Sequence, residues 1–182
     1  MLIEVEARFI NLARGEIEKK LEELGAKKQF EAMFEEWLFF YPEWEKDHRR
    51  VRVRTDGKRA WLTYKANPTW EVDSTEEAEI TVSSAEGAVK FIEAVGVPLR
   101  RYQQKRRIRY ALDSIIFDLD FWPKIPMVVE IEAANKEDVR RGAELLGLKW
   151  EDAIFVDQCT LHKKYYGINL LEMKEYVFDT RK

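Results

Sequence analysis

Charged side chains recur at every second position of the stretch IEVEARF, residues 3–9. Successive side chains of a strand point to opposite faces, so Glu4, Glu6 and Arg8 would share one face and the apolar residues the other. Paired carboxylates can hold a divalent cation, and an arginine can hold phosphate oxygens. An ordinary strand with one face in water has the same pattern, so one such strand does not by itself indicate a site.

Six further segments repeat this alternation, and each carries charges of largely one sign. The acids on the charged faces are Glu4, Glu6, Glu77, Glu79, Asp118, Asp120, Glu130 and Glu132, and the bases are Arg8, Arg52, Arg54, Lys65, Lys105, Arg107 and Arg109. Like charges at alternate positions of a strand repel, so mutual pairing is a poor reason for them. A metal-bound polyphosphate would satisfy both sets, because carboxylates bind Mg²⁺ or Mn²⁺ and clustered Arg and Lys bind phosphate.

Eight strands and three helices are expected to position these charges. Period-two runs predict strands at or near residues 3–9, 30–41, 49–55, 59–66, 76–83, 103–112, 114–121 and 126–133. Apolar residues at helical spacing and a closing glycine predict helices in NLARGEIEKKLEELG, SSAEGAVKFIEAVG and NKEDVRRGAELLG. Ser83 with Glu86, and Asn135 in the last helix, have the spacing of N-terminal caps. The tail TLHKKYYGINLLEMKEYVF is expected to be mostly helical.

Short turns between strands, such as TDGK at 55–58 and ALDS at 111–114, predict hairpins and an antiparallel sheet. Three amphipathic helices need apolar surface to cover, so the apolar strand faces are expected to point outward and the charges inward. The predicted fold is therefore α+β, an eight-stranded antiparallel β-barrel with helices packed on the outside. Eight strands enclose room for side chains or one small ligand, and the alternative is a barrel whose charges are solvated or structural.

Composition limits the class of protein. The chain has 182 residues, with 46% hydrophobic and 36% charged residues, which predicts one domain over residues 1–182. One cysteine, Cys159, and two histidines, His48 and His162, disfavour a Cys/His zinc site, and both histidines are expected to be exposed. The N-terminus reads as a strand and no apolar run has the length of a membrane span, so a cytoplasmic setting is expected.

The order of these motifs resembles the CYTH group, or triphosphate tunnel metalloenzymes, which includes class IV adenylyl cyclases, thiamine triphosphatases and inorganic tripolyphosphatases. EVEAR is similar to the ExExK signature of the group. Further matches in the same order are RVR, LTYK, EAE, KRR and LDFWPKIPMVVEIE, and the similarity extends over nearly the whole chain. The resemblance implies an eight-stranded tunnel that binds a triphosphate and a divalent metal, Mg²⁺ or Mn²⁺.

Carried over residue by residue, the resemblance implies three kinds of role. Metal ligands, or groups that assist the metal or a water, would be Glu4, Glu6, Glu77, Glu79, Asp120, Glu130 and Glu132. Phosphate contacts would come from Arg8, Arg52, Arg54, Lys65, Lys105 and Arg107, with Lys163 or Lys164 as a further contact. Catalytic residues would be Arg8, Lys65 and Asp120.

Two departures from the family pattern affect the expected chemistry. Arg8 stands where the signature has lysine, and an arginine binds phosphate well but exchanges protons very poorly at neutral pH. Many relatives also carry a tyrosine and an aspartate in the second strand before a proline, where this chain reads LFFYP. Phe39 and Phe40 cannot supply the acid chemistry of that tyrosine.

The expected function is metal-dependent hydrolysis of a triphosphate such as tripolyphosphate, thiamine triphosphate or ATP. A class IV adenylyl cyclase, which converts ATP to cyclic AMP and pyrophosphate, would use the same phosphate contacts, so the motifs do not separate the two reactions. A module that binds polyphosphate or a nucleotide without turnover is a third hypothesis. Nucleic-acid binding through RRVRVR and KRRIRY is disfavoured by the near balance of 31 basic and 34 acidic residues, and a homodimer is compatible with the sequence.

Overall fold

The computed structural model describes residues 2–66 and 75–179, and the side chains of residues 2–4, 47 and 75 lie outside this description. The strands are β1 (Leu2–Phe9), β2 (Lys27–Phe39), β3 (Arg50–Thr55), β4 (Ala60–Ala66), β5 (Thr75–Val82), β6 (Leu99–Leu112), β7 (Ile115–Phe121), β8 (Val128–Ala133) and β9 (Glu175–Tyr176). The helices are α1 (Arg14–Glu23), α2 (Ala85–Ala94), α3 (Lys136–Leu145) and α4 (Gln158–Tyr166), with short 3-10 turns η1 (Pro42–Asp47), η2 (Trp150–Asp152) and η3 (Leu170–Glu172).

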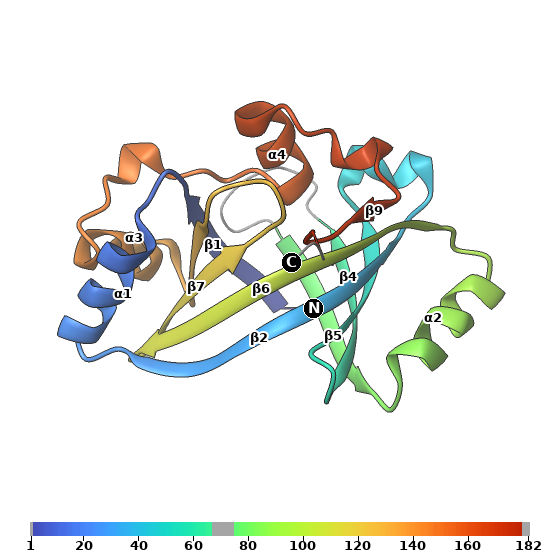
Figure 1. The fold of residues 1–182 in the computed structure, drawn as a ribbon, viewed down its shortest axis with the longest axis horizontal. Helices are drawn as coiled ribbons and strands as arrows, with labels where there is room; N and C mark the ends of the chain where they lie inside the picture. Colours follow the sequence, from blue (N-terminus) through green and yellow to red (C-terminus); the bar gives the residue numbers. More distant parts are fainter. Residues whose placement is uncertain (1, 67–74, 180–182) are drawn as a thin grey trace.

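The eight long strands pair in a ring. The order is β2-β3-β4-β5-β1-β8-β7-β6, and β6 pairs back to β2, every one of these pairings being antiparallel. The two longest strands, β2 and β6, run side by side across the molecule in Figure 1. The predicted eight-stranded antiparallel barrel, with helices on its outside, is confirmed.

The hairpins lie at the predicted turns. Between β3 and β4, Asp56 Oδ1 accepts hydrogen bonds from the backbone N–H groups of Lys58 and Arg59, and Gly57 has φ +83°. Between β6 and β7, Asp113 takes a positive φ of 51°, which aspartate tolerates better than most residues. These two turns set the register that places the charged residues of each strand on one face.

The helices cover the outward apolar faces of the sheet. In Figure 1, α1 and α3 lie together on one side and α2 on the other. Val5, Ala7 and Phe9 of β1 are buried in the core that contains α1 and α3. Gly142 allows α3 to approach the sheet closely, because a Cβ atom there would lie 2.8 Å from Cγ2 of Ile131. The apolar faces therefore point outward under the helices, as predicted.

One predicted helix cap is wrong by one residue. The side chain of Ser84, and not Ser83, caps α2 by accepting a hydrogen bond of 3.1 Å from the Gly87 N–H. Ser84 has extended backbone angles next to the first helical residue, whereas Ser83 lies one residue too early to reach that donor. The predicted cap of α3 is confirmed, since Asn135 Oδ1 accepts from the Asp138 N–H at 2.8 Å.

The tail is less helical than predicted. Helix α4 ends at Gly167, whose φ is +68°, and the chain continues through η3 into the two-residue strand β9. Strand β9 pairs in parallel with β6 at Tyr102 and Gln103, and Tyr176 is buried there. Because this pairing joins residues far apart in sequence, no local pattern predicts it. No helix in residues 2–66 and 75–179 combines the length and the apolar character that crossing a membrane requires.

Candidate functional site

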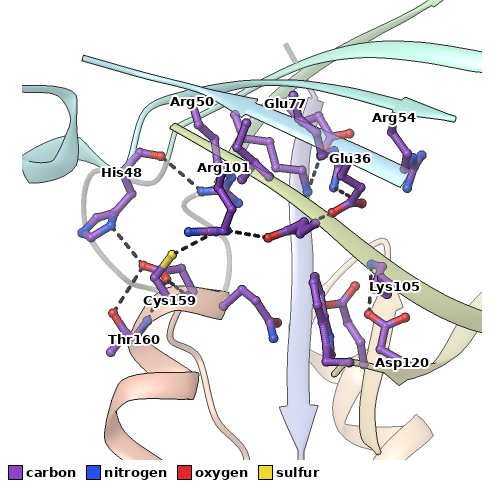
Figure 2. Close-up of a pocket in the computed structure, with 18 of the residues that line it drawn as sticks. Glu36, His48, Arg50, Arg54, Glu77, Arg101, Lys105, Asp120, Cys159 and Thr160 are labelled. Atoms are coloured by element: carbon purple, nitrogen blue, oxygen red, sulfur yellow. Dashed lines mark hydrogen bonds and ion pairs between the residues drawn. The ribbon is translucent and has the colours of Figure 1, made fainter. Parts of the chain in front are cut away.

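Charged side chains line a cavity of about 430 Å³ within the ring of strands. The predicted site residues that line it are Glu6, Arg8, Arg52, Arg54, Lys65, Glu77, Glu79, Lys105, Arg107, Asp120, Glu130 and Glu132. The side chain of Glu4, a predicted metal ligand, lies outside the described part of the structure. Lys163 and Lys164 are exposed on α4 and do not line the cavity. Figure 2 shows Glu36, Arg54 and Lys105 extending into this space from different strands.

Strands β6, β7 and β8 carry a group of charges that we call the tight cluster: Lys105, Arg107, Asp120 and Glu130, which line the cavity, and Asp118, which is buried beside them. Arg107 donates to both oxygens of Asp120, at 2.6 and 2.7 Å, and to Glu130 at 3.0 Å. It also pairs with Asp118. Burial alone would lower the pKa of Arg107, but these three carboxylates outweigh burial and raise it well above its usual value.

Lys105 is the second base of the tight cluster. Its Nζ donates to Asp120 Oδ2 at 3.1 Å and lies 5.1 Å from the ring centre of Trp122. Burial, followed by the charge of Arg107, lowers the pKa of Lys105. The carboxylate of Asp120 therefore holds two buried cations at once.

Arg8 lies between two acids of the cavity. Its Nη2 atom contacts Glu6 Oε1 and lies 2.9 Å from Glu130 Oε2, and its Nη1 atom donates to the Val156 carbonyl at 2.9 Å. Burial opposes the charge of Arg8, but Glu6 and Glu130 raise its pKa above the usual value. At this position, which the family signature gives to lysine, the guanidinium is a cation fixed between carboxylates.

Strands β3, β4 and β5 form the other part of the lining, which we call the loose cluster: Arg52, Arg54, Thr63 and Glu79. Arg52 and Arg54 lie 3.7 and 3.4 Å from Glu79 Oε2, and that oxygen already accepts from the Thr63 hydroxyl at 2.8 Å. Burial and the charge of Arg52 lower the pKa of Arg54 to about 10. The Nε atoms of both arginines are buried, and residues 2–66 and 75–179 offer them no hydrogen-bond partner. This cluster has donors left over for an anion.

Lys65 of β4 forms a close ion pair with Glu77 of β5, its partner in the strand register. Both were predicted to contact a ligand or metal, and both line the cavity. The structure therefore brings the β4 lysine to the same space as the arginines of β3, as the alternation of charges predicted.

Several polar residues of the cavity were not among the predicted site residues, and three of them form a connected group: Glu36, Arg101 and Gln103. Gln103 donates to Glu36 Oε2 at 2.6 Å and accepts from Arg101 Nε at 2.7 Å. The sequence carried a signal for two of them, because the inward positions of β6 continue the alternation from Lys105 back through Gln103 and Arg101. Strand β6 begins at Leu99, four residues before the predicted start, which explains the omission of Arg101, whereas Gln103 lay at the predicted start and is uncharged. Glu36 is a single charge between apolar inward neighbours and gave no such signal.

Residues at the amino-terminal end of α4 also line the cavity, together with His48. Asp157 caps α4 by accepting from the Cys159 and Thr160 N–H groups, and its other oxygen lies 3.1 Å from His48 Nδ1. Hydrogen bonds and nearby charges outweigh burial and lower the pKa of Asp157 to about 2. The expected exposure of the histidines is wrong: His48 is half-buried, and His162 is fully buried with its pKa lowered to about 4 by burial.

The acids of the cavity have the oxygen chemistry that Mg²⁺ and Mn²⁺ prefer. Within the described residues, however, no three His, Cys, Asp or Glu side chains lie together as a metal site would require. Instead, each predicted metal ligand with a described side chain contacts a base: Glu6, Glu77, Glu79, Asp120, Glu130 and Glu132. As arranged here, these side chains do not fit a preformed metal site, and metal binding remains a prediction.

Comparison with known proteins gives matches among solved structures only. Scans of family models and of curated proteins gave no match for this chain. The PH1012 protein of Pyrococcus horikoshii is 26% identical, with a TM-score of 0.75 over 85% of this chain and 96% of its own. A proposed adenylate cyclase from Vibrio parahaemolyticus is 15% identical, with a TM-score of 0.73 over 86% of this chain and 95% of its own.

A more distant match is HpAC1 of Hippeastrum, a proposed adenylyl cyclase with a dominant triphosphatase activity. It is 13% identical, with a TM-score of 0.61 over 93% of this chain and 99% of its own. At such identities the likeness is one of fold. The matches extend over most of each chain, and the barrel, its strand order and the inward charges agree with the motifs in the sequence. The chain has the CYTH-type fold, that of the triphosphate tunnel metalloenzymes.

Proposed function

We propose that this protein binds a triphosphate-containing substrate in the cavity and hydrolyses it. The observation that carries the proposal is the loose cluster: two half-buried arginines whose nearest carboxylate lies 3.4 Å or more away and whose Nε atoms have no hydrogen-bond partner within the described ranges. A polyphosphate, which carries several acceptor oxygens along its length, would satisfy these donors. The triphosphatase activity named for the Hippeastrum protein, which shares this fold, is in line with the proposal.

The volume and lining of the cavity also support a small anion with an organic part. Its volume of about 430 Å³ lies within the usual range for small-molecule sites. Apolar side chains from Leu38, Phe40, Trp122 and Leu171 line it together with the charged residues. We therefore favour a triphosphate that carries an organic group over bare tripolyphosphate as the natural substrate.

The residues of the cavity would act mainly by charge and position. Phosphoryl transfer needs stabilisation of negative charge on the phosphate oxygens and little covalent chemistry from the protein. Arg52, Arg54 and Lys65 would hold the phosphates, while Arg107 and Lys105 offset the acids on that side of the cavity. Arg8 would contribute charge and no proton transfer, because its pKa lies far above neutrality.

The experiment is a product assay on tripolyphosphate, thiamine triphosphate and ATP, each with and without Mg²⁺ or Mn²⁺. Release of orthophosphate identifies a triphosphatase, and release of pyrophosphate with cyclic AMP identifies a cyclase. Tight binding of all three ligands without any product would overturn the proposed hydrolysis. An Arg52→Gln variant serves as the control, since product formation that survives at the wild-type rate would come from a contaminant.

Binding without turnover is the second candidate function, and the position of Arg8 favours it. A guanidinium between Glu6 and Glu130 occupies the point toward which those two carboxylates turn. Replacing Arg8 by lysine separates the two functions. If Arg8 holds the site in a binding-only state, Arg8→Lys should raise product formation, whereas an active wild-type enzyme should lose activity or keep it unchanged.

A further inference from the structure

The buried carboxylate of Glu36 has one oxygen that no hydrogen bond uses. Glu36 is 1% exposed and lines the cavity. Its Oε2 atom accepts a hydrogen bond of 2.6 Å from Gln103 Nε2. Its Oε1 atom is buried and has no hydrogen-bond partner among the described residues, and Arg52 Nη1, at 3.7 Å, is too distant to be one. A buried carboxylate oxygen without a donor costs free energy, so its place in a ligand cavity calls for a ligand donor.

Glu36 is held firmly in this orientation. The amide of Gln103 cannot turn freely, because its oxygen accepts from Arg101 Nε at 2.7 Å while its nitrogen donates to Glu36. Arg101 is itself fixed by a 2.6 Å hydrogen bond to the Leu170 carbonyl, beside Cys159 of α4. Figure 2 shows the line of interactions that runs from Cys159 through Arg101 toward Glu36. The free oxygen of Glu36 therefore keeps one direction.

The charge state of Glu36 is also fixed. The groups that face it are Arg52 and Arg54 from β3, and Lys105 and Gln103 from β6. Burial would raise the pKa of the carboxyl group, but Lys105, Arg52 and Arg54 outweigh burial and hold the pKa at about 2. An ionised carboxylate only accepts hydrogen bonds, so it repels a bare phosphate oxygen and binds one that carries a proton.

We propose that Glu36 Oε1 accepts a hydrogen bond from a protonated terminal phosphate oxygen of the ligand and so makes the cavity specific for a polyphosphate chain end. This inference rests on the proposed triphosphate binding and adds its specificity. A terminal phosphate keeps a second proton with a pKa near 6, whereas an internal phosphate has no such proton. The loose cluster next to Glu36 supplies the donors for the remaining oxygens of the same phosphate.

The test is calorimetric titration of tripolyphosphate into wild-type protein, Glu36→Gln and Glu35→Gln. Glu35 is a matched control, because it precedes Glu36 on β2 but its Oε1 accepts from the Tyr102 hydroxyl, and it does not line the cavity. At pH 8, wild type and the control should take up close to one proton per bound ligand, measured in buffers of different ionisation enthalpy. Glu36→Gln should take up clearly less, because its amide can donate to a bare oxygen.

The affinities give a second readout. Between pH 6 and pH 8.5, the affinity of wild type for tripolyphosphate should fall about tenfold or more. The fall in affinity of Glu36→Gln over the same range should be at least severalfold smaller. Glu36 raises the pKa of Lys105, so both proteins are also measured with Lys105→Arg, which removes any proton uptake at that position. Proton uptake near zero in the wild type, or equal uptake in wild type and Glu36→Gln, would overturn the inference. The wild-type measurement stands even if the variant does not fold. Absence of tripolyphosphate binding to the wild type would instead refute the proposed function itself.

Discussion

Two arginines of the same cavity, Arg107 and Arg54, have pKa values shifted in opposite directions. Three carboxylates at hydrogen-bond distance raise the pKa of Arg107, whereas burial and a neighbouring arginine lower that of Arg54 to about 10. Both side chains line the tunnel, and both come from strands with alternating charges. The difference lies in their partners across the sheet: β7 and β8 present three acids to Arg107, whereas β2 presents one acid, Glu36, and β4 presents the Trp61 ring to Arg54.

This difference indicates that the two clusters of the tunnel have different roles, one in stability and one in ligand binding. The tight cluster has satisfied its own charges and gains little from an anionic guest. The loose cluster has positive charge and free donors, and it gains from a guest that brings oxygens. We therefore expect changes in the tight cluster to affect stability first, and changes in the loose cluster to affect ligand binding first. Four predictions follow from this contrast, in order of expected size.

Removing Asp120, the acid of the tight cluster that contacts both Arg107 and Lys105, should destabilise the protein most. Asp120 is 3% exposed and holds Arg107 and Lys105 together. Asp120→Asn would leave these buried cations without their shared anion and should lower the free energy of unfolding by about 3–5 kcal/mol, measured by urea denaturation. Asp113→Asn, in the exposed turn at the end of the same strand pair, is the control and should change stability by less than about 0.5 kcal/mol. A small effect at Asp120 would remove the distinction between the clusters.

Acid should weaken the fold through Glu36. Its pKa is about 2 in the folded protein and 4.5 when unperturbed, so the unfolded chain binds more protons between these values. Stability from this group is complete above pH 4.5 and is lost as the pH falls toward 2, by about 3 kcal/mol in total. In urea denaturation between pH 6 and pH 3, Glu36→Gln should lose less stability than wild type. If the free energies of unfolding of the two proteins fall in parallel with pH, the pKa of Glu36 is not lowered in the folded protein.

Arg52→Gln should weaken tripolyphosphate binding by about 10- to 100-fold and change stability by less than about 1 kcal/mol. The reason is that Arg52 meets its nearest acids only at 3.7 Å, so it contributes little to the fold but much to an anion. Calorimetry and urea denaturation measure the two quantities. Arg106→Gln, on the outer side of β6, should leave affinity unchanged. An Arg52→Gln variant that is clearly less stable than wild type but keeps its affinity would show that the loose cluster stabilises the fold and does not bind the ligand.

The smallest expected effect concerns Glu79, which competes with a guest for Arg52 and Arg54. Without metal, Glu79→Gln should raise affinity for tripolyphosphate by about two- to fivefold, because a repulsive charge is removed. If Glu79 is also a metal ligand, the same variant should bind more weakly than wild type once Mg²⁺ is added. Glu76→Gln, exposed on the same strand, is the control for both titrations. A loss of affinity in Glu79→Gln without metal would show that Glu79 does not compete with the ligand for the two arginines.

Local patterns predicted the elements well where the signal lies within a few residues of the chain. The alternation in β1, β3, β4, β5, β7 and β8 and the turns at residues 55–58 and 111–114 gave the strands and their hairpins. The three helices followed from apolar spacing and closing glycines, with an error at the Ser84 cap because two serines are adjacent. Strand β9 and the burial of His162 depend on contacts with distant segments, which no local pattern carries.

The sequence by itself determined many of the charged residues that line the tunnel, because in a strand the side-chain period of two fixes the face once one residue is assigned. It also determined that Arg8 replaces the signature lysine. Only the tertiary structure decided which charges meet: Arg107 lies among three acids, Arg54 lies opposite Glu36 with Glu79 at 3.4 Å, and Oε1 of Glu36 has no hydrogen-bond partner in the part of the chain that the structure describes. Pairing across a closed sheet depends on the register of strands far apart in sequence, and this register sets the energy of every buried charge.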